Sequence, residues 1–197
     1  YGSYSEETRL RVESAAHALR YRANGVARSL RLRRTKSVGV LINQITSYHW
    51  TNFVRGVEEA AYQAGYHVII CNTNDDPKRE IAYLSEMRER GVDGIIASPL
   101  LANRRKFKDM VSGSLPAVFV NSRIAGGNLV HISSDDRSAA CDAVLYLSAA
   151  GHRRIGIVAG PQEFETGQAR LGGYGDGLEQ AGIEPDRELI AYGDFRQ

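Results

Sequence analysis

The chain has 197 residues, 43% of them hydrophobic and 24% charged, which suits one large or two small globular domains and excludes a disordered chain. No run of eighteen apolar residues occurs and the first residues are polar, so we expect neither a membrane span nor a signal peptide. The net charge of +2 hides an asymmetry, because residues 1–36 hold nine basic and three acidic side chains while the remainder is acidic overall. A basic arm before an acidic body favours a polyanionic partner such as nucleic acid.

Two helices are expected in the basic arm. Ser5, followed directly by acidic residues, is typical of an N-cap, and apolar residues at helical spacing continue the pattern over residues 6–19. A second helix, residues 24–32, is only about two turns long. Isolated helices of this length are marginal in water, so we expect it to fold only against a partner.

From residue 37 onward, apolar runs alternate with amphipathic helical patterns. The apolar runs cover residues 37–42, 67–71, 94–97, 117–120, 130–133 and 154–159, with a further strand expected at 189–192. The helical patterns cover residues 48–64, 78–90, 104–111, 135–150 and 167–181. This alternation predicts an α/β fold with doubly wound parallel sheets. Ligands of such sheets bind beyond the carboxyl ends of the strands, here the loops that begin at Asn43, Asn72, Ser98, Asn121 and Gly160.

Other patterns argue against catalysis and metal binding. Cys71 and Cys141 show no redox or metal spacing, and we expect both to be buried and reduced. The glycines between residues 172 and 177 do not fit a phosphate-binding loop and instead predict a weak helix stabilised by packing. No nucleophile motif is visible, so we expect a protein that is not an enzyme and has no cofactor.

The order of several short motifs resembles the lactose/galactose repressor (LacI/GalR) family of transcription regulators. The matching segments include YSEETR at 4–9, YRANGVARSL at 21–30, TKSVGV at 35–40, FVRGVE at 53–58, RGVDGII at 90–96, GHRRI at 151–155 and RLGGY at 170–174. The resemblance implies that residues 1–36 are the end of a helix-turn-helix DNA-binding head plus a hinge helix. Residues 37–133 would form the N-terminal lobe, and residues 134–197 part of the C-terminal lobe, of an effector-binding domain like that of periplasmic binding proteins. It also implies that the first helices of the head and the end of the sensor lie outside this sequence.

The hinge helix carries the DNA contacts that the resemblance implies. Leu30 corresponds to an apolar wedge that enters the minor groove and unstacks base pairs, although an ordinary linker leucine is the alternative. Ala23 stands where proline is usual and Gly25 weakens the short helix, which reduces its tendency to fold on DNA. The remaining residues predicted to bind DNA are Tyr21, Asn24, Ala27, Arg28 and Arg31.

The resemblance places the effector in a cleft between the two lobes. Tyr48, His49 and Trp50 can stack on a sugar or a purine, with Gln44 and Thr46 as hydrogen-bond donors, unless the rings simply cap the core. Arg170 corresponds to a forked donor for the oxygens of the effector. The other predicted contacts are Asn121, Asp136, Phe164, Thr166 and Phe195.

We therefore predict a cytoplasmic, homodimeric repressor that binds pseudo-palindromic double-stranded operator DNA. A small molecule, expected to be a carbohydrate, sets its affinity for DNA through a preference for one arrangement of the lobes. A periplasmic-type sugar-binding protein is the main alternative, but it would need a signal peptide and would have no use for the basic arm. An enzyme on a doubly wound sheet is the other alternative.

Overall fold

The structure, a computed structural model, describes residues 5–19, 21, 34–111, 115–124 and 129–194 of a chain that forms two compact units, residues 1–35 and 36–197. In the first unit, helix α1 (Glu6–Ala18) begins after Ser5, whose hydroxyl accepts a hydrogen bond from the backbone N–H of Thr8 at 3.3 Å. This confirms the predicted N-cap. Tyr21 is exposed, and the other residues predicted to bind DNA (Asn24, Ala27, Arg28, Leu30 and Arg31) lie outside the described residues.

The second unit contains a five-stranded parallel sheet in the order β2-β1-β3-β4-β5. Its strands are β1 (Ser37–Ile42), β2 (His67–Asn72), β3 (Gly94–Ala97), β4 (Ala117–Val120) and β5 (Val130–Ile132). The connection after β1 runs to β2 on one side and the connection after β3 runs to β4 on the other, and ligands of such sheets bind at the carboxyl ends of the two strands where the direction changes. The predicted α/β class is confirmed.

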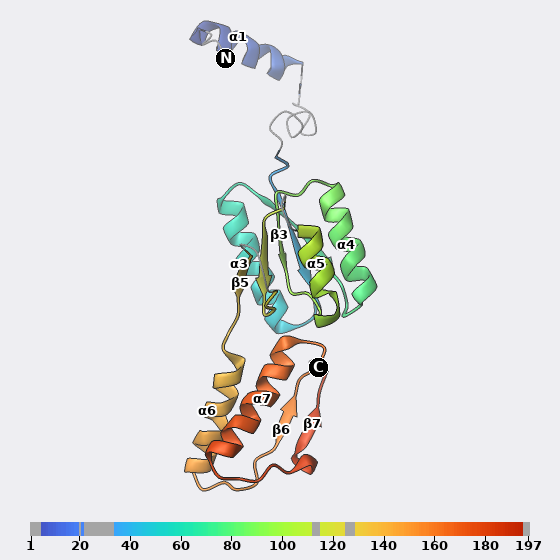
Figure 1. Ribbon diagram of the computed structural model, residues 1–197. Coiled ribbons are helices and arrows are strands. Elements are labelled where there is room, and N and C mark those ends of the chain that lie inside the picture. The colour runs from blue at the N-terminus through green and yellow to red at the C-terminus, as the bar shows by residue number, and fades with distance from the viewer. Residues whose placement is uncertain (1–4, 20, 22–33, 112–114, 125–128, 195–197) are drawn as a thin grey trace. The chain divides into compact units, whose positions relative to one another are not determined.

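Helices cover both faces of this sheet, with α3 (Tyr48–Gln63) on one side and α4 (Pro77–Glu89) and α5 (Arg104–Val111) on the other (Figure 1). The main core lies between the sheet and the α4–α5 side, where Leu84, Phe107 and Phe119 are fully buried. A short 3-10 turn, η1 (Leu101–Asn103), precedes α5. We call this part of the unit, β1 to β5 with its helices, the first lobe.

The second lobe has a two-stranded parallel sheet, β6 (Ile157–Ala159) and β7 (Ile190–Tyr192), with α6 (Asp136–Ala149), α7 (Glu165–Gln180) and a 3-10 turn, η2 (Arg187–Leu189). Helices α6 and α7 approach closely, and a Cβ on Gly173 would overlap the backbone carbonyl oxygen of Arg137. The guanidinium of Arg137 also donates two hydrogen bonds to Asp176, at 2.6 and 2.8 Å. The glycine-rich stretch is therefore a packing surface of α7, as expected.

Two expectations needed correction. Cys141 is buried, but Cys71 is only partly buried because β2 is an edge strand of the sheet. The sixth predicted strand, residues 154–159, is shorter than expected because β7 pairs only with Ile157–Ala159. Among the described helices, none combines the length and apolar character that a bilayer crossing requires.

Candidate functional site

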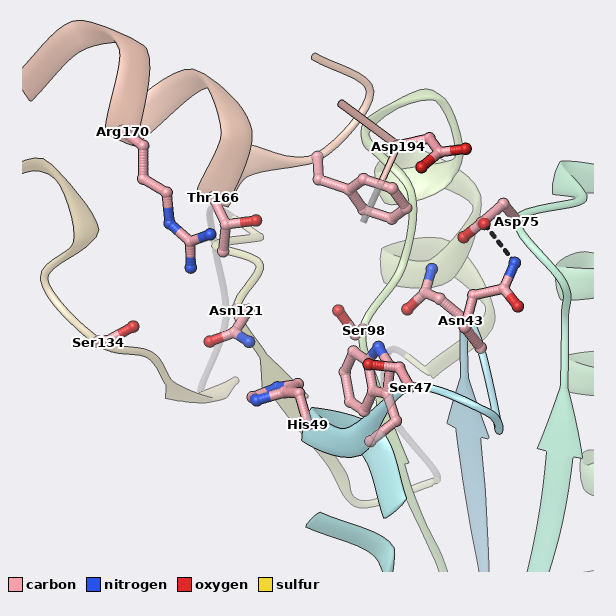
Figure 2. A pocket seen from close by; sticks show the side chains of 13 residues that line it. Asn43, Ser47, His49, Asp75, Ser98, Asn121, Ser134, Thr166, Arg170 and Asp194 are labelled. Carbon is pink, nitrogen blue, oxygen red and sulfur yellow. Dashed lines mark hydrogen bonds between the residues drawn. The ribbon is translucent and has the colours of Figure 1, made fainter. Parts of the chain in front are cut away.

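A pocket of about 420 Å³ opens where the two lobes of the second unit face each other (Figure 2). This volume lies within the usual range for small-molecule sites, about 300–1,000 Å³. Side chains of both lobes line it: Asn43, Gln44, Ser47, His49, Trp50, Asp75, Ser98, Asn121 and Ser134 precede α6, and Phe164, Thr166, Arg170 and Asp194 follow it. The shape of the pocket therefore depends on how the two lobes are positioned.

The floor of the pocket is formed by residues that directly follow strands of the large sheet. Asn43 follows β1, Ser98 follows β3 and Asn121 follows β4. These residues lie together because parallel strands bring their carboxyl ends to one edge of the sheet. Asn43 is 4% exposed and Ser98 is 7% exposed. Asn121 adopts a left-handed backbone with φ of 53°, which asparagine tolerates better than most residues.

Ring side chains at the start of α3 form part of the wall. The rings of His49 and Trp50 pack edge to face, with their centroids 5.0 Å apart. The ring of Phe53 packs edge to face on Trp50 in turn, with a centroid distance of 5.5 Å. These contacts fix the indole next to the pocket rather than deep in the core. Tyr48 does not line the pocket and is 78% exposed, and Thr46 does not line it either.

The opposite wall comes from the first turns of α7. Thr166 and Arg170 are separated by one helical turn and lie on the side of the pocket away from Asn43 and His49 (Figure 2). The Nε of Arg170 donates to Oδ1 of Asp136 at 2.7 Å. Asp136 does not line the pocket but positions Arg170, and the remaining predicted residue, Phe195, lies outside the described residues.

Acidic side chains are the main feature that sequence reasoning missed. Asp75 and Asp194 line the pocket, and Oδ2 of Asp75 accepts a hydrogen bond from Nε2 of Gln44 at 2.8 Å. Ser47 and Ser134 were missed as well. The loop after β2 was indicated by the strand pattern, but Asp75 reaches the pocket through a turn in which its φ is 58°.

Contacts between the lobes lie directly beside the pocket. Oε2 of Glu165 pairs with the guanidinium of Arg104 and accepts from the backbone N–H of Arg123 at 2.7 Å. The backbone N–H of Leu101 donates to the carbonyl oxygen of Glu163 at 3.2 Å. Burial at this junction lowers the pKa of Arg104 from its ordinary value.

The side chains of the pocket are suited to binding a ligand. The lining combines amides, hydroxyls, three ring side chains and a forked guanidinium, which suits a ligand rich in oxygen atoms. Over the described ranges of the chain, no group of three His, Cys, Asp or Glu side chains could hold a metal ion.

Comparison with known proteins gives a consistent family assignment. Residues 35–196 match the family described as periplasmic binding proteins and sugar binding domain of the LacI family. The probable HTH-type transcriptional regulator EndR of Paenibacillus polymyxa is 34% identical, and the alignment covers 98% of this chain and 58% of that protein. The HTH-type transcriptional repressor PurR of Klebsiella pneumoniae (strain 342) is 33% identical, with 97% of this chain and 57% of that protein covered. The chain therefore spans less than two thirds of the length of these relatives.

A similar solved structure is that of a periplasmic binding protein/LacI transcriptional regulator from Alkaliphilus metalliredigens QYMF, complexed with D-xylulofuranose. It shares 28% identity and a TM-score of 0.67 over 81% of this chain and 56% of that one.

Proposed function

The chain belongs to the family of periplasmic binding proteins and LacI sugar-binding domains, and from this premise we propose that the protein is a repressor whose affinity for operator DNA is set by a carbohydrate ligand. The family resemblance predicted from the sequence is confirmed by this match. The observation that carries the proposal is a pocket lined by both lobes within a domain of this family. The relatives' names favour gene regulation over catalysis.

The amino-terminal residues favour a DNA-binding regulator over the periplasmic alternative. The family match begins at residue 35, but the alignment with EndR covers 98% of the chain and so includes most of the earlier residues. These residues carry the basic excess, which a protein that only binds sugars does not need. The proposal therefore assigns residues 1–36 to DNA binding, residues 37–133 and 134–197 to the two lobes of the sensor, and the whole protein to the cytoplasm.

The arrangement of the site supports a mechanism in which the ligand stabilises one relation of the two lobes. A ligand held by Asn121 on one side and by Thr166 and Arg170 on the other gains contacts only when the lobes lie together. The contacts of Glu165 with Arg104 and of Leu101 with Glu163 add to that closed state. A ligand with such a differential affinity shifts the population of the closed state, and in a homodimer this shift alters how two hinge helices meet DNA.

Specific residues are proposed for each role. The ligand contacts are His49, Trp50, Asn121, Phe164, Thr166 and Arg170, with Asp136 holding Arg170 and Phe195 retained from the sequence prediction. The DNA contacts are Tyr21, Asn24, Ala27, Arg28, Leu30 and Arg31, with Leu30 as the wedge between base pairs.

The proposal is tested by selection of genomic fragments. The intact protein is incubated with sheared genomic DNA of the organism that encodes it, with and without a mixture of sugars. The retained fragments are then sequenced. We expect a pseudo-palindromic motif to be enriched, and the enrichment to change when sugars are present. Retention that follows fragment length alone, with no shared motif in either condition, would exclude a sequence-specific regulator.

A further inference from the structure

One buried side-chain amide at the pocket makes no hydrogen bond within the part of the chain that the structure describes. Asn43 is 4% exposed, and neither its Oδ1 nor its Nδ2 has a hydrogen-bond partner among the described residues. The carbonyl oxygen of the preceding residue, Ile42, is already used by the backbone N–H and the hydroxyl of Thr73, at 2.8 and 3.2 Å. Buried polar groups are nearly always partnered, and an unpartnered amide destabilises the folded state. The position of Asn43 on the pocket floor (Figure 2) indicates that its partner is a ligand.

The charges around the pocket restrict what that ligand can carry. Asp75 and Asp194 line the pocket, and Arg170, the one cationic side chain in the described lining, already pairs with Asp136 at 2.7 Å. The four groups together carry a charge of −2. A phosphate or carboxylate placed among them would be repelled by three carboxylates and attracted by a single guanidinium, whose charge Asp136 already offsets. The lining also offers the hydroxyls of Ser47, Ser98, Ser134 and Thr166 and the amides of Gln44 and Asn121, none of which carries a charge.

We propose that the ligand of this pocket is an uncharged polyol that places two adjacent hydroxyl groups on the side-chain amide of Asn43, and that phosphorylated and carboxylated sugars are excluded. An amide suits such a pair, because Oδ1 accepts from one hydroxyl while Nδ2 donates to its neighbour. Trp50, fixed edge to face by Phe53, offers an apolar surface to the C–H groups of a sugar ring. The inference rests on the proposed function and adds the chemical class of the ligand and a specificity-determining residue.

Calorimetry on the intact protein tests the ligand class. The protein is titrated with matched sets of three probes, each a neutral pentose, hexose or disaccharide with its phosphate ester and its uronic acid. We expect the binders to come from the neutral set, with each anionic counterpart weaker by about tenfold or more. An anionic probe that binds more tightly than its neutral parent overturns the inference, as does a panel in which no neutral sugar binds. Neither result bears on DNA recognition, which is measured separately by fragment selection.

The role of Asn43 is tested by Asn43→Leu, which removes both unpartnered polar atoms and keeps the volume. We expect the affinity for the best neutral probe to fall by about tenfold and the melting temperature without ligand to rise by about 2–4 °C. The matched control is Asn103→Leu, because the Nδ2 of this buried amide donates to Pro77 O at 2.8 Å and to Glu80 Oε2 at 2.5 Å. The control should lower the melting temperature. Unchanged ligand affinity in Asn43→Leu, or a loss of stability equal to that of the control, would show that Asn43 is structural.

Discussion

Glu80 in α4 is a buried carboxyl group whose ionisation makes the stability of the first lobe dependent on pH. Its side chain is 1% exposed, and it accepts hydrogen bonds from the backbone N–H of Leu100 at 2.9 Å and from Nδ2 of Asn103 at 2.5 Å. Burial raises the pKa of Glu80 from its ordinary 4.5 to about 7, with the nearby Asp75 raising it further and the two hydrogen bonds opposing the shift. The folded protein therefore holds this proton more tightly than the unfolded chain.

The sign of the pH dependence follows from that difference. Between pH 4.5 and 7 the folded state binds more protons at Glu80 than the unfolded state, so stability falls as the pH rises through this window. At about 1.4 kcal/mol per pH unit, the full loss is about 3 kcal/mol and is complete above pH 7. Glu80→Gln removes the ionisation. In this variant the NH2 group of the glutamine replaces the oxygen that accepts from Nδ2 of Asn103. Because two donors then face each other, one hydrogen bond is lost, at about 1 kcal/mol.

We therefore expect Glu80→Gln to be more stable than the parent protein by about 2 kcal/mol at pH 8 and equally stable near pH 5. Urea unfolding followed by the fluorescence of Trp50, the single tryptophan, measures both values. The control is Glu89→Gln, an exposed acid of the same helix, which should show no such pH-dependent difference. A Glu80→Gln protein that is less stable than the parent at pH 8 would refute the reasoning, because it would mean that the carboxylate stabilises the fold.

Three further predictions, two of them with control variants, test other parts of the structure. Glu165→Gln removes the ionic contact between the lobes and should weaken ligand binding in calorimetry by about tenfold, or about 1.4 kcal/mol; Glu163→Gln, whose backbone alone bridges the lobes, should bind normally, and equal losses would remove the ion pair from the mechanism. Gly173→Ala should lower the free energy of unfolding by about 1–3 kcal/mol, because its methyl group would overlap α6. By contrast, Gly175→Ala, with open space around it, should raise that free energy by about 0.5–1 kcal/mol; the reverse order in chemical denaturation would contradict the packing of α6 on α7. Leu30→Ala should weaken operator binding in gel-shift titrations while calorimetry shows unchanged sugar binding, and intact operator affinity would end the wedge hypothesis.

The parallel direction of the strands in the large sheet explains why much of the site could be predicted. Apolar runs fixed the positions of five strands, and the parallel arrangement then directed attention to the residues that follow them, such as Asn43, Ser98 and Asn121. The rule depends only on the direction of the strands, so it needs no knowledge of side-chain packing. The loops named by this rule do contribute to the pocket.

Other parts of the site depend on packing that a linear pattern does not contain. Tyr48, His49 and Trp50 were expected to act together, but successive residues of a helix point about 100° apart, so all three cannot face one pocket, and Tyr48 is exposed. Asp75 enters through the local conformation of a turn, and Asp194 through the return of the chain after β7. The glycine-rich α7 shows the same limit, since its stability depends on how closely α6 approaches.

The most direct test joins the sugar pocket to DNA recognition in one measurement. Fluorescence anisotropy of a labelled operator, taken from the fragment selection, gives the Kd for DNA as a neutral sugar that binds in calorimetry is titrated in. We expect this Kd to change by about tenfold in the intact protein, the range typical of coupling between sites. In Asn43→Leu the same change should require about tenfold more sugar. An operator affinity that does not respond to any sugar that occupies the pocket would contradict ligand-controlled repression.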